Sequence, residues 1–140
     1  MGRASIRDQW KAKLEGKGVS SKVSAWELNQ GGVSFVGQVL GVDPSLRGTG
    51  LSLIEFKKGK SPIMLRCQTV TMKPKIPMSE CLGEIFRSVT CFLDDFTVDH
   101  VALEQTIYVQ NFQTAQILGA ARGAATAAAA VQGKPIFEYA

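Results

Sequence analysis

The sequence has only one histidine and three cysteines, which leaves little material for a metal cluster or a disulfide framework. Cys67, Cys81 and Cys91 form no C-x-x-C pair, and their odd number argues against paired disulfides. No histidine stands near them at the spacing that zinc ligands need. We therefore predict three reduced thiols in or near the core of a cytoplasmic protein.

Long hydrophobic runs are also missing. The longest apolar run, residues 124–131, is interrupted by Thr126 and is far too short to span a bilayer. No apolar signal segment follows Met1. We expect a protein without a signal peptide and without a membrane partner.

Acidic residues are fewer than basic ones, with 12 Asp and Glu against 16 Lys and Arg. The net charge of +4 mildly favours a polyanionic partner. Basic charge gathers in residues 1–35, where six basic residues face three acidic ones, and at Lys57, Lys58 and Lys60.

The length of 140 residues fits one domain. Residues 1–35 show no sustained hydrophobic periodicity and end beside Gly31-Gly32, which is typical of a flexible basic arm. Such an arm touches DNA phosphates or is simply a solvated tail, and the second reading is favoured. We predict that residues 36–140 form the folded domain.

The first half of that domain reads as three strands. Residues 36–42 are apolar on both faces, as in a central strand, and residues 50–56 form a second strand. The "KKGK" segment is typical of a hairpin turn, and residues 62–72 alternate as a third strand. The short links predict an antiparallel meander.

The second half alternates helices and strands. Pro74 and Pro77 break the pattern, and Ser79 is the expected N-cap of a one-faced helix. The predicted helix, strand, helix and strand cover about residues 79–96, 100–105, 111–131 and 135–140. The order β-β-β-α-β-α-β predicts an α/β fold with a mixed five-stranded sheet, whose later strands run parallel to the first.

Two carboxylates stand at the ends of predicted strands, Asp43 on the first and Glu104 on the fourth. If these strands pair in parallel, both acids lie at one edge of the sheet. Two close negative charges repel and raise one pKa unless a divalent cation lies between them, and Mg²⁺ prefers such oxygen ligands. Alternatively, Asp43 before Pro44 only starts a turn and Glu104 caps a loop.

The segments "LGVDPSLRGTG" and "VALEQTIYVQNFQTAQILGAARGAATAAAAVQGKPIFEY" resemble the RuvC family of bacterial Holliday-junction resolvases, over residues 36–140. The resemblance implies an RNase H-like fold and a homodimer that nicks two opposed strands of a four-way DNA junction. It implies Mg²⁺ as cofactor, with Mn²⁺ as a substitute, and a branch-migration complex as a further partner. By the same resemblance, Asp43 and Glu104 are the catalytic and metal-binding residues.

Four residues are candidates for DNA binding. Arg47 lies in the loop next to Asp43, and Tyr108 stands beside Ile107, where the family carries an aromatic residue. Asn111 and Arg122 belong to the second predicted helix. For Asn111 and Arg122 two interpretations are open: contact with DNA phosphates, or a solvated position on the helix surface.

The sequence departs from the family in ways that bear on activity. Ser45 replaces a glycine after the Asp-Pro pair. The family's last two acidic ligands lie on a C-terminal helix beyond the position of Ala140, so the resemblance implies a C-terminally truncated domain. We expect an incomplete site that holds ions poorly, unless a partner or a continuation of the chain supplies the rest. One sheet face is expected to be partly bare.

Two other functions stay open at this stage. One is a non-catalytic remnant that binds branched DNA. The other is a nucleotide-binding protein of the actin and sugar-kinase superfamily, whose phosphate loop also follows a strand with the pattern D-x-G-x-x-x-x-G.

Two further features have alternative readings. The small-residue stripe on the second helix packs on the sheet or contributes to a dimer contact, and it comprises Ala115, Gly119, Gly123 and Ala127. His100 is expected to cap the start of a strand rather than to act as a base.

Overall fold

The computed structural model describes residues 34–105 and 110–139, which form one sheet and two helices. The elements are β1 (Gly37–Asp43), β2 (Gly48–Phe56), β3 (Ile63–Thr71), α2 (Met78–Asp95), β4 (His100–Glu104), α3 (Phe112–Val131) and β5 (Ile136–Tyr139). The predicted order is confirmed, and each boundary lies within two residues of its expected place.

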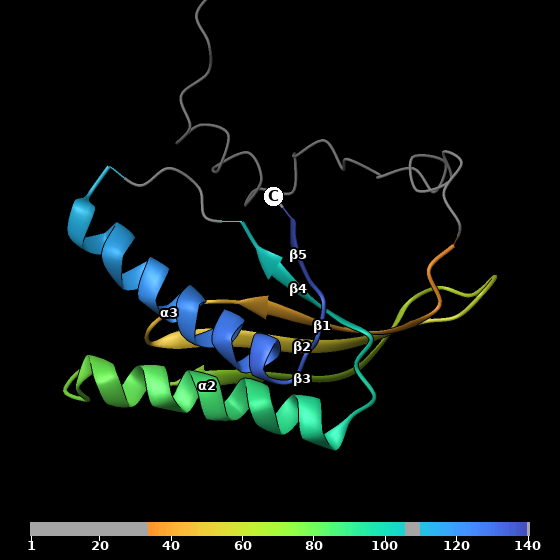
Figure 1. Ribbon diagram of the computed structural model, residues 1–140, viewed down its shortest axis with the longest axis horizontal. Coiled ribbons are helices and arrows are strands. Elements are labelled where there is room, and N and C mark those ends of the chain that lie inside the picture. Colours follow the sequence, from red (N-terminus) through yellow and green to blue (C-terminus); the bar gives the residue numbers. More distant parts are fainter. Residues whose placement is uncertain (1–33, 106–109, 140) are drawn as a thin grey trace, which may run out of the picture. The chain divides into compact units, whose positions relative to one another are not determined.

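The sheet has the strand order β3-β2-β1-β4-β5, with β1 in the centre (Figure 1). The first three strands form an antiparallel meander. The last two strands run parallel to β1, because each is reached through a helix that returns the chain to its starting edge. The predicted mixed five-stranded sheet is confirmed.

Both helices lie side by side on one face of the sheet (Figure 1). Alternate residues of the central strands point at them, so Leu40, Leu53, Val101 and Leu103 are almost completely buried. From α2, Ile85 completes this core. The hydrophobic core therefore occupies the helix face alone.

Helix α2 forms as predicted, but Ser79 is not its N-cap. The cap residue is Pro77, in an extended conformation and without a side-chain hydrogen bond, and Ser79 lies inside the first turn. Proline already fixes the backbone angle of the residue that precedes the helix, and Met78 can begin the helix directly after it. The proline, which the sequence reading took for a breaker, sets the start.

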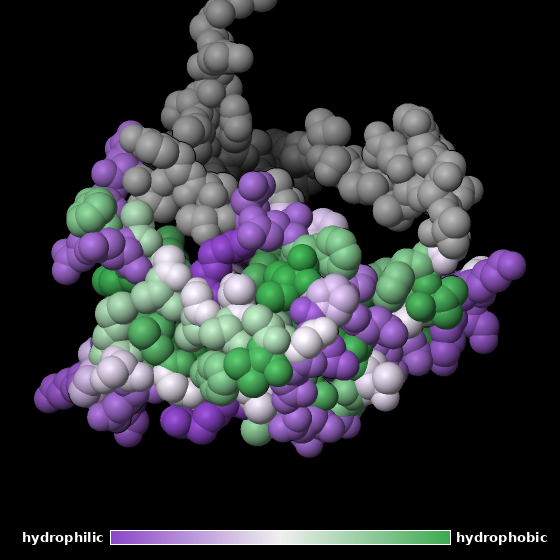
Figure 2. Space-filling model, in the orientation of Figure 1, coloured by the Kyte–Doolittle hydropathy of each residue, from purple (hydrophilic) through white to green (hydrophobic). Residues whose placement is uncertain are grey.

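Helix α3 packs through alanines on one side, and these are Ala121, Ala125, Ala128 and Ala129. The alternative that the stripe 115/119/123/127 packs on the sheet is wrong. A Cβ atom on Gly119 or Gly123 would meet nothing within 4 Å, so this stripe faces outward. Figure 2 shows the resulting band of weakly hydrophobic residues along α3, with hydrophilic residues along α2.

Within residues 34–105 and 110–139, no element packs against the opposite face of the sheet. We call it the open face. At the edge where β4 begins, His100 packs edge-on against Phe35 and Phe137, with ring centroids 4.9 and 5.0 Å apart. His100 is therefore a packing residue at the start of its strand. Residues 1–33 of the predicted arm lie outside the described residues.

The cysteines only partly follow the prediction. All three are free, but only Cys81 is buried. Cys67 is exposed because it belongs to the open face of the edge strand β3, and Cys91 is exposed on α2. Within the described segments, neither helix combines the length and the apolar character that crossing a membrane requires.

Candidate active site

Asp43 and Glu104 end adjacent parallel strands. The preceding residues, Val42 and Leu103, are register partners, so the two acids emerge side by side at one edge of the sheet. Strand alternation turns both carboxyl groups onto the open face. The pKa of Glu104 is raised, because its carboxyl group hydrogen-bonds to that of Asp43 and lies beside its negative charge. The two carboxyl groups therefore form a pair within hydrogen-bonding reach of each other.

A groove of about 630 Å³ lies on the open face beside this pair. Its floor is formed by the small residues Gly41, Ser52 and Ala102, and the carboxylates lie among its lining residues. Gly50 is the register partner of Asp43, and a Cβ atom there would lie 3.6 Å from the Asp43 Cβ. Small side chains therefore leave room for a ligand at the two acids.

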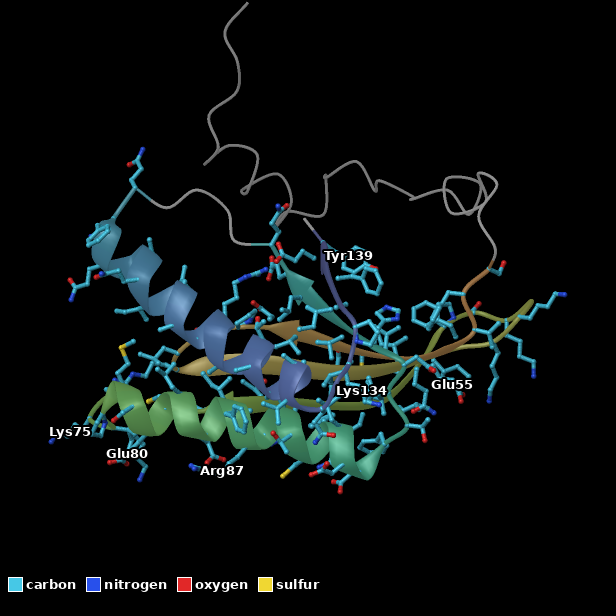
Figure 3. All side chains as sticks on the ribbon, viewed as in Figure 1. Glu55, Lys75, Glu80, Arg87, Lys134 and Tyr139 are labelled. Carbon is cyan, nitrogen blue, oxygen red and sulfur yellow. The ribbon has the colours of Figure 1, made fainter. Side chains whose placement is uncertain are left out.

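Tyr139, which the sequence analysis did not single out, also lines the groove. It ends β5 next to Glu104, its register partner, and is 54% exposed (Figure 3). Its position could have been predicted from the parallel pairing of the last two strands, because parallel strands end at the same edge of the sheet.

The turn after Asp43 is fixed by a buried hydroxyl group. Thr49 is completely buried, and its hydroxyl donates to the Ser45 carbonyl at 2.6 Å and accepts from the Ser45 amide at 3.2 Å. Ser45, which stands where the family has glycine, therefore contacts Thr49 through its backbone amide and carbonyl. Sequence reasoning missed Thr49, whose only signal was a polar residue at an inward position of β2.

Arg47 is hydrogen-bonded inside the protein. Its Nη1 donates to the carbonyls of Lys73 and Ile76 at 2.7 and 2.8 Å, and to the Cys81 sulfur at 3.2 Å. Its own carbonyl accepts from the Met72 amide at 3.1 Å. Arg47 therefore ties the turn after Asp43 to the segment before α2, and its predicted DNA contact stays a prediction.

Replacing Arg47 by methionine is expected to destabilise the protein by about 1–3 kcal/mol, because two carbonyls lose their charged donor, and the hydrogen bond to Ile76 is partly buried. Urea unfolding measures this change. The matched control, Lys75→Met, removes an exposed positive charge from the same segment and is expected to change stability by less than about 0.5 kcal/mol. Equal effects of the two variants would contradict the structural role of Arg47.

The other DNA-binding candidates are placed as follows. Asn111 is the N-cap of α3, and its side chain accepts from the Thr114 amide at 3.1 Å. Arg122 donates to the Glu104 carbonyl at 2.6 Å and pairs with Glu138. Tyr108 lies outside the described residues. The contacts of Asn111 and Arg122 are internal, and their DNA-binding role stays a prediction.

The carboxylate pair fits part of a hard-cation site. Mg²⁺ in proteins is commonly held by one or two carboxylates, with water and substrate phosphates as the remaining ligands. Asp43 and Glu104 provide the two carboxylates, and the open groove leaves room for the other ligands. Across the described parts of the chain, they are not joined by a third Asp, Glu, His or Cys that would complete a metal cluster.

The strand order, the helices and the acids at the edge of β1 and β4 define an α/β protein of the RNase H-like fold. A family model described as "Crossover junction endodeoxyribonuclease RuvC" matches residues 39–140. The chain belongs to the RuvC family.

Relatives and solved structures agree with this membership. The RuvC endonucleases of Rhodopseudomonas palustris and Myxococcus xanthus are 37% and 36% identical over 103 residues, which is 74% of this chain. The chain spans only 59% and 53% of those two relatives.

Among solved structures, Thermus thermophilus RuvC in complex with a Holliday junction substrate matches with a TM-score of 0.70 and 29% identity, over 74% of this chain and 62% of that one. The yeast mitochondrial Holliday junction resolvase matches with a TM-score of 0.54 over 93% of this chain and 63% of that one. At 11% identity it supports the fold alone.

Proposed function

We propose that this chain belongs to a structure-selective endonuclease that resolves four-way DNA junctions in recombination and repair. The observation that carries the proposal is the meeting of Asp43 and Glu104 at one edge of the sheet, beside an open groove. Mg²⁺ is the proposed cofactor and Mn²⁺ its substitute, since both accept carboxylate oxygens as ligands. The names of the relatives and the junction bound by T. thermophilus RuvC support the choice of substrate.

Asp43 and Glu104 are the proposed catalytic residues and metal ligands. When bound, metal ions activate water and stabilise the oxygen that leaves the phosphodiester. The protein's own part is to hold the two carboxylates fixed at the ends of paired strands and to keep the space beside them free. Asp43 raises the pKa of Glu104 through a hydrogen bond between the two carboxyl groups and through its negative charge, and a cation would relieve the repulsion between the charges.

A homodimer is the proposed assembly, and its proposed partners are branched DNA and a branch-migration complex. The outward stripe of α3 supports the dimer, since Gly119 and Gly123 leave its surface flat. Phe112 and Val131, near its two ends, are 76% and 78% exposed. Sedimentation equilibrium distinguishes a dimer from a monomer.

A cytoplasmic location is also proposed. The three free cysteines support it, because thiols stay reduced in that compartment. Cell fractionation with a marker for each compartment tests it.

The experiment that tests the function compares DNA substrates. A labelled four-way junction, incubated with the chain and Mg²⁺ or Mn²⁺, is expected to be nicked at symmetric positions, whereas a linear duplex of the same sequence is left intact. A chelator is expected to stop the reaction. Equal nicking of both substrates, or nicking that survives chelation, would contradict the proposal.

A second candidate function is binding of branched DNA without cleavage. One observation favours it: among the described residues, the two carboxylates stand without a third acidic ligand. It predicts junction binding that weakens steeply with salt and no nicking with any metal. A lack of preference for junction over duplex would refute it. Family membership decides against the nucleotide-binding alternative.

A further inference from the structure

We infer that Arg122 is a positioning residue for Glu104, which it holds from the helix face of the sheet. Arg122 comes from the middle of α3 and is far from Glu104 in sequence, yet its Nη1 donates to the Glu104 carbonyl at 2.6 Å. The inference rests on the proposed function only in taking Glu104 as a metal ligand.

The arginine lies mostly inside the protein. Its side chain is 18% exposed and forms an ion pair with Glu138 of β5, which is 54% exposed. One guanidinium group thus joins α3 to the ends of both β4 and β5. A planar group with several fixed N–H donors is suited to hold a carbonyl and a carboxylate at once.

The two sides of the sheet separate Arg122 from the groove. Glu138 is the register partner of Leu103, whose side chain lies in the core beneath the helices. The Glu104 carboxyl group points the other way, onto the open face, where it lines the groove. Arg122 therefore holds the backbone behind Glu104 and does not line the groove where a ligand would bind.

The peptide group that follows Glu104 is held at both of its polar atoms. Its carbonyl accepts from Arg122, and its N–H, which belongs to Gln105, donates to the Tyr139 carbonyl at 2.7 Å. Fixing this peptide plane limits rotation of the backbone that carries the Glu104 side chain. A metal ligand held in place loses less conformational freedom when it binds, so metal affinity depends on such support.

The test uses Arg122→Met and two independent readouts. Hydrogen exchange of the Gln105 amide, measured without metal, is expected to become at least about tenfold faster, because the peptide loses its second anchor. The Kd for Mn²⁺, measured by calorimetry, is expected to weaken by about 10–100-fold, as for other residues that support metal ligands. Arg122→Lys retains the charge with fewer donors, and both of its readouts are expected to lie between those of the wild type and of Arg122→Met.

The matched control is Arg87→Met. Arg87 forms a similar ion pair, with Glu84 at 2.8 Å, but on the outer side of α2 (Figure 3). It is expected to change neither readout. If Arg122→Met unfolds the protein, Glu138→Gln replaces it, since this variant removes the ion pair alone and is expected to shift both readouts in the same direction.

Two results would overturn the inference. One is an unchanged exchange rate at Gln105 in both Arg122→Met and Glu138→Gln. The other is an Arg122→Met variant whose affinity for the junction falls while its affinity for Mn²⁺ stays constant. If the slope of log affinity against log salt concentration also falls by about one, Arg122 contacts a DNA phosphate instead. If wild-type protein binds no Mn²⁺, the proposed function fails, and the exchange rate still decides the role of Arg122.

Discussion

Replacing Asp43 by asparagine is expected to lower metal-dependent junction nicking by about a thousandfold and to remove most of the stabilisation that metal gives the protein. Without metal at pH 7, the variant is expected to unfold at a higher temperature than the wild type, because it removes a negative charge beside Glu104. With Mn²⁺ the order is expected to reverse. The Kd for Mn²⁺ is expected to weaken at least about a hundredfold, since loss of a direct ligand exceeds loss of a supporting residue.

The raised pKa of Glu104 determines how the metal-free stability of the wild type and of Asp43→Asn should depend on pH. The pKa of Glu104 is raised in the folded state, so the folded protein binds this proton more tightly than the unfolded chain does. The stabilising contribution is complete below the ordinary glutamate pKa and is lost as the pH rises through the raised value. Asp43→Asn removes the main cause of the shift, and its metal-free stability is expected to fall less between about pH 4 and 7.

Thermal unfolding with and without Mn²⁺, over a pH series, measures both effects. Glu84→Gln is the control, because it removes an exposed carboxylate from α2 and leaves the groove untouched. It is expected to keep the Mn²⁺ response of the wild type. Nicking that survives Asp43→Asn, or a Mn²⁺ response that persists in it, would remove Asp43 from the metal site.

The pairing of the two acids followed from strand patterns that are local in the sequence. Val36–Val42 reads as a buried strand and residues 100–105 as another, and a helix between them favours parallel pairing. Once these strands lie in parallel, their last residues meet at one edge, as Asp43 and Glu104 do. The sequence predicts this much because strand alternation and connection rules do not depend on distant side chains.

The arginines show where such reasoning stops. Arg47 and Arg122 were predicted as DNA contacts because each lies near a carboxylate or on a helix surface. In the structure, Arg47 donates to carbonyls 26 and 29 residues away, and Arg122 donates to one 18 residues away. The destination of a long charged side chain depends on which carbonyls the tertiary fold leaves without a partner, and no local pattern records them.

The outward face of α3 has a similar explanation. Nearly every residue from Leu118 to Val131 is small or apolar, so the helix carries no clear amphipathic pattern from which to choose its buried side. The choice is made by the fit of Ala121, Ala125 and Ala128 against the core. Helix α2, whose apolar residues fall on one side, buries Ile85, Val89, Phe92 and Leu93 on that side.

The sharpest difference in stability is expected between two adjacent residues of β2. Leu53 points at the helices and is completely buried, whereas Ile54 points at the open face and is only half-buried. Leu53→Ala is expected to destabilise the protein by about 2–5 kcal/mol, because it removes buried methyl groups and leaves a cavity among the residues of the core. Out of a total of about 5–15 kcal/mol, such a loss is large.

Ile54→Ala is the matched control, since it lies on the same strand and also shortens a branched aliphatic residue. Its cost is expected to stay below about 1.5 kcal/mol, because part of its surface already faces solvent. Urea unfolding of both variants measures the difference. Equal losses would show that the open face is packed as tightly as the helix face.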